Sequence, residues 1–157
     1  MAVREVLLHP DPLLTRRAER ATDPDAVIAD LLDTMRSFGH CVGIAAPQIG
    51  EGVRVAVVDC TGHPKAPDAH GELVLVNPVI VEAHGAEVGR EGCLSIPELT
   101  ANVRRATHVT VEAEGLRVEA TGFEARALQH EIDHLDGLLF LDRVESLEAD
   151  VFRRRRP

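Results

Sequence analysis

The spacing of apolar residues predicts two main helices. In the first of them, apolar residues recur at steps of three and four, at Val27, Ile28, Leu31, Leu32, Met35 and Phe38. Because this spacing places apolar side chains on one face, we expect an amphipathic helix that starts after Thr22-Asp23-Pro24 and ends near Gly39. The second helix is expected from about 123 to 135, where Gly137 can end it.

Valine-rich and alternating segments predict the strands. Strands are expected at 53–59, 73–76, 79–83, 108–114 and 116–120. Gly115 separates the last two, which favours a hairpin, and 61–71 has the prolines and glycines of a surface loop. Short helices are expected from the His9–Pro12 turn to about Ala18 and over 146–152. Helices and mostly antiparallel strands segregate along the chain, so we expect an α+β fold rather than alternating βαβ units.

Composition bounds the size of the fold and the class of partner. The 157 residues, 45% of them hydrophobic, suffice for one domain over residues 1–157, and no repeat or long linker divides them. The net charge of −9 argues against sequence-specific nucleic acid as the main partner, because phosphate binding needs a positive face. The arginine run 153–156 is the exception: it is either a solvated tail or an electrostatic tether to RNA, for instance on a ribosome.

Neither a membrane span nor a disulfide framework is expected. No segment approaches the roughly 20 apolar residues that cross a bilayer, and the N-terminus does not have the pattern of a signal peptide. The three cysteines, Cys41, Cys60 and Cys93, are an odd number without framework spacing. We therefore expect a cytoplasmic protein in a reducing compartment.

A His-Glu-x-x-His segment is the most specific chemical pattern in the chain. On the predicted helix, His130 and His134 lie on one face and can bind a single metal ion, and Glu131 is placed to handle the proton of a water molecule. The alternative is a surface helix with two solvated imidazoles. The segment is framed by Leu128, Ile132, Leu135 and Leu138. This apolar frame favours a packed helix and therefore the metal site.

A catalytic metal usually has three protein ligands, so a third is needed. Downstream of Leu138 there is no histidine, and only Glu145 and Glu148 remain as candidates. Upstream, Glu91-Gly92-Cys93-Leu94-Ser95 offers Cys93 beside a glycine that permits close approach. The alternative for Cys93 is a buried inert thiol, and a purely structural site would need Cys41 or Cys60 as a fourth ligand.

The run of small and apolar residues from Gly43 to Gly50 is a third candidate region. Its Gln48 amide supplies donors that could stabilise a developing oxyanion. Taken alone, such a run is more often a surface on which a helix and a sheet pack.

Together, the three stretches resemble the signature motifs of peptide deformylases. The family patterns GxGxAAxQ, EGCxS and QHExDHLxG occur here in the same order, at 41–48, 91–95 and 129–137. The segments 9–14 and 137–143 are also similar to the ends of that family. The one departure is Cys41, which stands where the family has its first glycine. This side chain could narrow the substrate pocket or place a second oxidisable thiol near the metal.

The resemblance implies a fold, a reaction and a ligand set. Mostly antiparallel sheets would pack around a central helix that carries the metal motif, in a single deformylase domain. The implied reaction removes the N-formyl group from the initiator methionine of nascent bacterial polypeptides and releases formate. Cys93, His130 and His134 would hold one divalent metal ion, natively Fe(II), with Zn(II), Ni(II) or Co(II) possible in a purified sample. Glu131 would be the general base, and the Gln48 amide and the Leu94 backbone N–H would stabilise the oxyanion.

The resemblance also implies how the substrate binds. Gly43 and Gly92 would pair with an extended N-formylmethionyl peptide as an added strand. Candidates for the walls of the methionine pocket are Ile44, Phe123 and Ala127, for which ordinary core packing is the alternative. Gln129 and Asp133 are expected to orient the ligands, although Asp133 could equally form a surface ion pair.

Other interpretations stay open from the sequence. The chain could be another HExxH metallohydrolase, such as a zinc peptidase with a downstream third ligand. It could also be a divergent, non-catalytic deformylase-like protein that binds metal or the ribosome. We expect a monomer.

Overall fold

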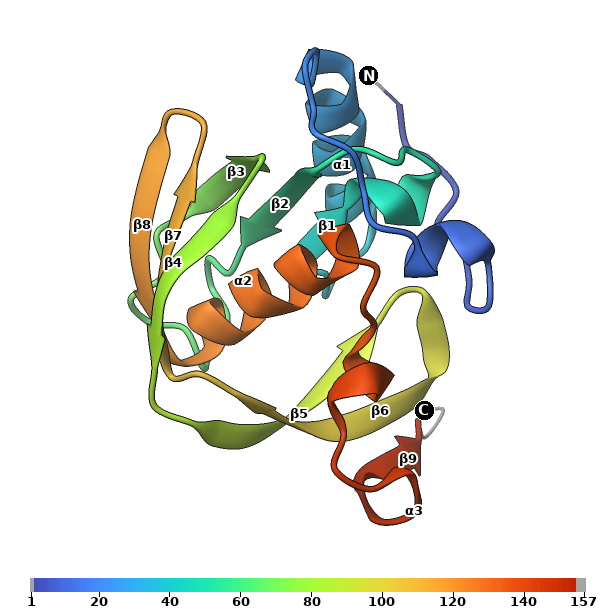
Figure 1. The fold of residues 1–157 in the computed structure, drawn as a ribbon, viewed down its shortest axis with the longest axis vertical. Helices are drawn as coiled ribbons and strands as arrows, with labels where there is room; N and C mark the ends of the chain where they lie inside the picture. Colours follow the sequence, from blue (N-terminus) through green and yellow to red (C-terminus); the bar gives the residue numbers. More distant parts are fainter. Residues whose placement is uncertain (1, 155–157) are drawn as a thin grey trace.

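Three small antiparallel sheets surround one helix in the computed structural model, which describes residues 2–154 (Figure 1). The central helix is α2 (Gly122–Leu135), and the mixed α+β architecture agrees with the expectation from the sequence. Helix α1 (Asp25–Ser37) lies against the first sheet, and three short 3-10 helices complete the frame: η1 (Pro12–Thr15), η2 (Ala46–Ile49) and η3 (Phe140–Arg143).

The first sheet has the order β1-β2-β3, from β1 (Gly43–Ala45), β2 (Val55–Asp59) and β3 (Glu72–Val76). The predicted valine-rich strand is β2, and its first four residues are buried. Strand β1 was not predicted from the sequence, since three residues are too few to carry a pattern. It pairs only with β2, so its other edge is open within the described sheet.

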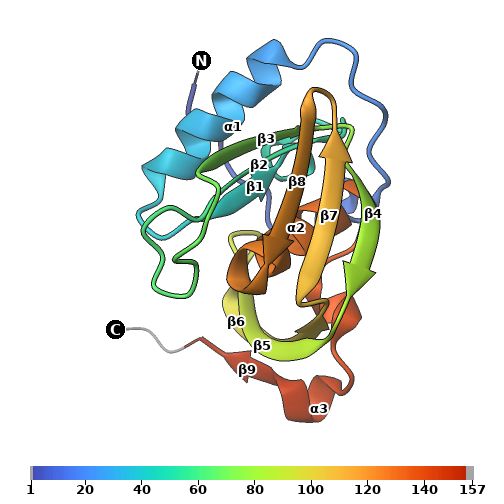
Figure 2. The ribbon, with the colours of Figure 1, turned by 90° about the vertical axis from the view of Figure 1, so that its left-hand side faces the viewer.

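The second sheet contains the predicted hairpin. Strands β7 (His108–Ala113) and β8 (Leu116–Thr121) pair directly, and Gly115 adopts a left-handed φ of 71° in the turn, which favours glycine. Strand β4 (Val79–His84) completes the order β4-β7-β8. Figure 2 shows this sheet covering one side of α2.

The third sheet is the largest departure from the sequence prediction. Strands β5 (Glu87–Cys93) and β6 (Ile96–Arg105) were not predicted, because glycines in β5 and charged residues in both strands interrupt the alternation. The expected helix at 146–152 is only partly right: α3 (Leu147–Asp150) is a single turn, and β9 (Val151–Arg153) then pairs with β6. Val151 and Phe152 are good strand formers, and here a partner strand is available.

The short helix near the N-terminus is also shorter than expected. It ends at Thr15, after which Arg16 is extended and the Ala18 N–H donates to the Leu135 carbonyl. This contact holds the N-terminal segment on the end of α2. Gly137 is required there, because a Cβ at this position would lie 2.7 Å from the Thr15 carbonyl oxygen.

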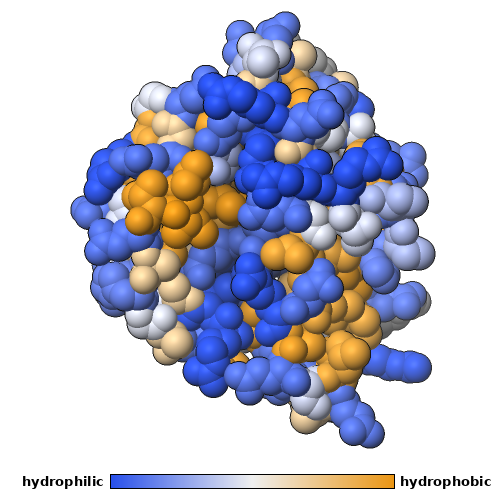
Figure 3. Space-filling model, in the orientation of Figure 1, coloured by the Kyte–Doolittle hydropathy of each residue, from blue (hydrophilic) through white to orange (hydrophobic). Residues whose placement is uncertain are grey.

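The core consists of three clusters of buried hydrophobic residues. The face of α2 that carries His130 and His134 lies outside these clusters. Leu128, Ile132 and Leu135 of α2 pack into the largest cluster, between the first and second sheets. Polar residues cover most of the face seen in Figure 3, with apolar side chains gathered in separate areas. Among residues 2–154, no helix has the length and apolarity needed to cross a membrane.

Candidate metal centre

The structure brings Cys93, His130 and His134 together. One ligand atom from each lies within 4.8 Å of those of the other two, and the distance from Cys93 Sγ to His134 Nε2 is 3.4 Å. The two histidines lie one helical turn apart on α2, as the sequence predicts, while Cys93 ends β5. Among the described residues, the cluster includes no downstream carboxylate, and it includes neither Cys41 nor Cys60. The candidate Glu145 instead pairs with Arg104 at the surface.

The donor set fits a catalytic metal. Burial alone would raise the pKa of the Cys93 thiol, but the neighbouring His134 and His130 outweigh it and hold this pKa well below its usual value. A thiolate beside two imidazoles is a ligand set that suits Fe(II), Zn(II), Co(II) and Ni(II), and three protein ligands are typical of a catalytic site. The residues present therefore fit one divalent ion.

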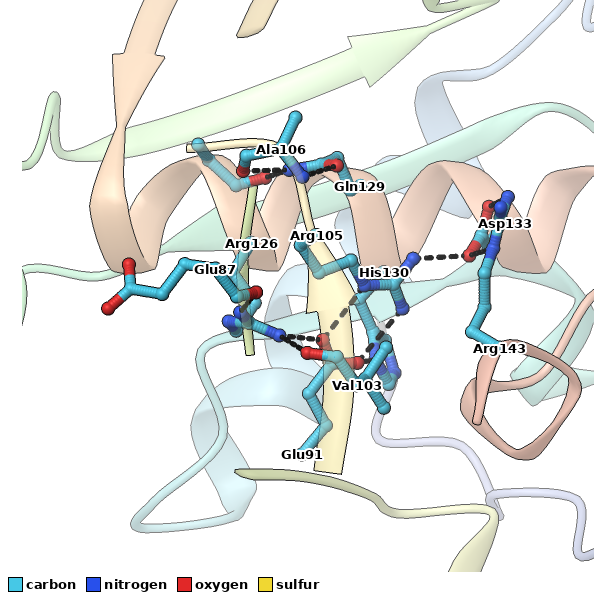
Figure 4. Close-up of polar contacts among 11 residues, drawn as sticks. Glu87, Glu91, Val103, Arg105, Ala106, Arg126, Gln129, His130, Asp133 and Arg143 are labelled. Carbon is cyan, nitrogen blue, oxygen red and sulfur yellow. Dashed lines mark hydrogen bonds and ion pairs between the residues drawn. The ribbon is translucent and has the colours of Figure 1, made fainter. Parts of the chain in front are cut away.

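Glu91 fixes the orientation of His130 (Figure 4). Glu91 and Cys93 are both buried on β5, and both contact α2: Glu91 through His130 and Cys93 through His134. The Glu91 carboxylate accepts from His130 Nδ1 at 2.8 Å, from Arg105 through two bonds and from Arg126 at 2.8 Å. Because Nδ1 carries the donated proton, the Nε2 lone pair of His130 is available to a metal.

Arg105 joins two buried carboxylates, those of Glu91 and Asp133. Besides Glu91, it donates to Asp133 Oδ2 at 2.5 Å, and Arg143 binds the same carboxylate with bonds of 2.9 and 2.8 Å (Figure 4). Asp133 is 6% exposed, so its expected alternative as a surface ion pair is wrong. It is a buried partner of Arg105, which also binds Glu91, the carboxylate that contacts His130.

These arginines were not identified from the sequence. Ala101, Val103 and Arg105 are all buried and alternate along β6, so Arg105 occupies the inward face of that strand. Had the strand been recognised, Arg105 would have been identified as a charged residue at a core position. Gln129, which was expected to orient a ligand, instead pairs its amide with both backbone groups of Ala106 (Figure 4).

Gln48 lies beside the cluster with its amide directed at it. It is 2% exposed in η2; its Oε1 accepts from the Ala45 N–H, and its Nε2 donates to Ser95 Oγ at 3.1 Å and to Cys93 Sγ at 3.5 Å. The amide orientation is therefore determined by bonds on both sides. The donor role expected of it stays a prediction.

A cavity of about 800 Å³ opens beside the cluster. Of the residues expected to contact substrate, it is lined by Gly43, Gly92, Phe123 and Ala127, together with Gln48 and Leu94. The expectation for Ile44 is wrong, because its side chain is fully buried in the second core cluster. Neighbouring residues of a strand point to opposite faces, so Gly43 faces the cavity and Ile44 the core.

Glu131 is buried at the wall of this cavity. It is 4% exposed, and its Oε1, like His134 Nδ1, has no hydrogen-bond partner among the described residues. Burial raises the pKa of this carboxyl group. A Cβ at Gly43 would lie 2.8 Å from Glu131 Oε2, so glycine at this position leaves the space that the carboxylate occupies.

Cys41 also lines the cavity, where it takes up space that a glycine would leave open. Its Sγ donates to the Gly43 carbonyl at 3.1 Å, and burial together with the Glu131 charge raises the pKa of the thiol to about 12. Because thiolate is the reactive form, we expect Cys41 to react with iodoacetamide at pH 7.5 at least about tenfold more slowly than in the unfolded chain. Peptide mass spectrometry measures this, and equal rates in the two states would contradict it.

The arginine run is described only in part. Arg153 ends β9 and Arg154 lines the cavity, whereas residues 155 and 156 of the run lie outside the described residues. The tether to RNA that was considered from the sequence stays a prediction.

Comparisons with known proteins agree on one family. The family model described as polypeptide deformylase matches residues 3–150. Peptide deformylase 2 of Vibrio cholerae is 42% identical over 163 residues, covering 99% of this chain and 94% of the relative. A peptide deformylase of Legionella pneumophila superposes with a TM-score of 0.83 at 38% identity, over 94% of this chain and 89% of the other. A Met-Ala-Ser-bound peptide deformylase of Acinetobacter baumannii superposes with a TM-score of 0.79 at 36% identity, over 91% and 99%.

Proposed function

The chain belongs to the polypeptide deformylase family, and we propose that Cys93, His130 and His134 hold the divalent metal ion of this enzyme. It is a metal-dependent hydrolase that removes the N-formyl group of nascent polypeptides. The observation that carries the assignment of ligands is the convergence of their donor atoms within 4.8 Å at the wall of the cavity. A bound divalent metal would supply Lewis acidity, which activates both water and the formyl carbonyl.

Fe(II) is the proposed native ion. A thiolate and two imidazoles support Fe(II), and they also support Zn(II), Ni(II) and Co(II) in a purified sample. Exchange of one ion for another is therefore expected to leave the protein ligands unchanged.

Glu131 is the proposed general base. Its carboxylate takes a proton from the attacking water and then delivers it to the leaving amine, so that formate and a free N-terminus result. Burial and the absence of a partner for Oε1 among the described residues support this role, because both favour proton uptake by the carboxylate.

Gln48 and Leu94 are the proposed oxyanion donors. The Gln48 amide is held against Cys93 and Ser95, and Leu94 follows Cys93 directly and lines the same cavity. Donors that are oriented before the reaction stabilise a developing charge without reorganisation.

The peptide is proposed to bind between two strand edges. Strand β1 carries Gly43, strand β5 carries Gly92, and each is an edge strand of its described sheet. Open edges offer backbone groups to an added strand. The relative from Acinetobacter baumannii binds Met-Ala-Ser, which supports a peptide of this kind here. Phe123 and Ala127 are proposed walls for the methionine side chain, because both line the cavity along α2.

We further propose that residues 1–157 form one deformylase domain that acts as a monomer in the cytoplasm. The family match over residues 3–150 supports the single domain, and the three free cysteines support a reducing compartment.

A formate-release assay tests the function. Metal-loaded protein assayed without oxygen should release formate from formyl-Met-Ala-Ser and leave acetyl-Met-Ala-Ser intact, because the cramped site near Glu131 admits hydrogen on the acyl carbon more readily than methyl. Absence of formate from a protein with full metal content would contradict deformylation and favour a non-catalytic protein. Cleavage of unformylated peptides would favour a peptidase.

Replacement of Cys93 tests the ligand set. Cys93→Ala should weaken metal binding by roughly 100-fold, since even the loss of an outer partner of a ligand costs about 10–100-fold. Metal titration of the apoprotein measures this. Cys60→Ala is the matched control, because Cys60 is buried in the core and lies outside the cluster. Equal metal affinity of the two variants would remove Cys93 from the ligands.

A further inference from the structure

The loop between β2 and β3 is attached to the N-terminal turn of α2. Glu124, which is 3% exposed, accepts from the His70 N–H at 2.8 Å and contacts His70 Nδ1 at 2.5 Å. Successive turns stiffen the loop, with His63 N donating to the Cys60 carbonyl and Ala66 N donating to the His63 carbonyl. The loop is therefore built onto the helix that carries the metal motif.

His63 extends this attachment into the cavity. Its ring stacks on Phe123, with centroids 4.0 Å apart and an angle of 7° between the planes, and both residues line the cavity. The Lys65 N–H donates to His63 Nδ1 at 3.1 Å, so the ring is held from its edge as well as its face.

The stack lies where the side-chain pocket should end. Phe123, Ala127 and His130 all line the cavity, and at 1.5 Å per residue Phe123 lies about 10 Å along α2 from His130. An extended methionine whose formyl group reacts near His130 would direct its thioether towards Phe123. The His63 ring stacked on Phe123 limits how far the methionine side chain can extend. It also prevents the Phe123 phenyl group from rotating away from the pocket.

We propose that His63 is a specificity-determining residue, which closes the end of the methionine pocket by its stack on Phe123. This inference rests on the proposed function. His63 belongs to the loop between β2 and β3, which lies outside the three motifs. The depth of the pocket then depends on the contact between this loop and α2. The site then accepts an unbranched side chain of methionine length and discriminates against a larger aromatic one.

The ratio of kcat/KM for formyl-Phe-Ala-Ser over formyl-Met-Ala-Ser tests the proposal, because a ratio does not depend on the active fraction of a preparation. His63→Ala should raise this ratio at least about tenfold, a size typical of small changes in an apolar pocket. His63→Phe retains a stacked ring and should stay within about threefold of the unchanged protein. Lys65→Ala is the matched control, since its exposed side chain lies on the same loop and does not line the cavity.

Two outcomes would overturn the proposal: an unchanged ratio in His63→Ala, or a rise in His63→Phe as large as that in His63→Ala. Calorimetric binding of Met-Ala-Ser and Phe-Ala-Ser to the metal-loaded proteins gives the same comparison without turnover. A protein that releases no formate, yet whose peptide preference changes as expected in His63→Ala, would refute deformylation and retain the pocket. Formate release with an unchanged ratio would refute His63 alone.

Discussion

Glu131→Gln should lower kcat/KM for formyl-Met-Ala-Ser by about 10²–10⁴-fold, the usual contribution of a general base. Glutamine has nearly the same shape as glutamate but cannot accept the proton of the attacking water. The metal content should not change, because Cys93, His130 and His134 are untouched. Formate release at saturating metal, together with metal analysis of the same samples, measures both effects.

The stability of this variant provides an independent check. Glu131 is buried and its Oε1 has no partner among the described residues, so its charge costs free energy in the folded state. The melting temperature of Glu131→Gln should therefore equal or exceed that of the unchanged protein. Glu119→Gln removes an exposed carboxylate from β8 and should retain full activity. Activity of Glu131→Gln within tenfold of this control would exclude Glu131 as the base.

Arg105→Met should destabilise the protein by about 3–5 kcal/mol, the range expected when one partner of a buried ion pair is removed. Arg105 donates to Glu91 and to Asp133, and the exposed fractions of these two carboxylates are 6% each. Methionine fills much of the volume but leaves both carboxylates short of a partner. Arg126 and Arg143 retain some contacts, so the effect should not exceed this range.

The neighbouring Arg104 is a matched control. It pairs with Glu145 at the surface, where the two side chains are 55% and 70% exposed, and Arg104→Met should cost about 0–1 kcal/mol. Thermal unfolding should show a decrease of roughly 6–20 °C for Arg105→Met in a chain of this size. Equal decreases for the two variants would mean that burial of the ion pairs does not determine their contribution.

Arg105→Met should also weaken metal binding, by about 10–100-fold. The Glu91 carboxylate binds both Arg105 and His130 Nδ1, so loss of the arginine frees the carboxylate that orients this ligand. The contacts of Arg105 thus contribute both to the stability of the third sheet and to the orientation of the metal ligand His130.

The sequence alone determined the parts of the site that lie within one helix. The spacing of His130, Glu131 and His134 defines their relative positions, because an α-helix returns to the same face every 3.6 residues. The first helix, the hairpin around Gly115 and the strand β2 follow equally from local periodicity. The candidate third ligand, Cys93, came from the upstream stretch 91–95, and the resemblance to a family then implied the full ligand set.

Tertiary structure decided which residues meet across elements. Strands β5 and β6 have weak patterns, and they form because they pair with each other and because β9 returns from the chain end to extend their sheet. For this reason the inward position of Arg105, its bonds to Glu91 and Asp133, and the buried position of Ile44 could not be predicted from spacing. The same holds for His63, whose stacking on Phe123 joins segments 60 residues apart. Local periodicity specifies the direction of a side chain within its own element, whereas the group that it meets depends on packing between distant segments.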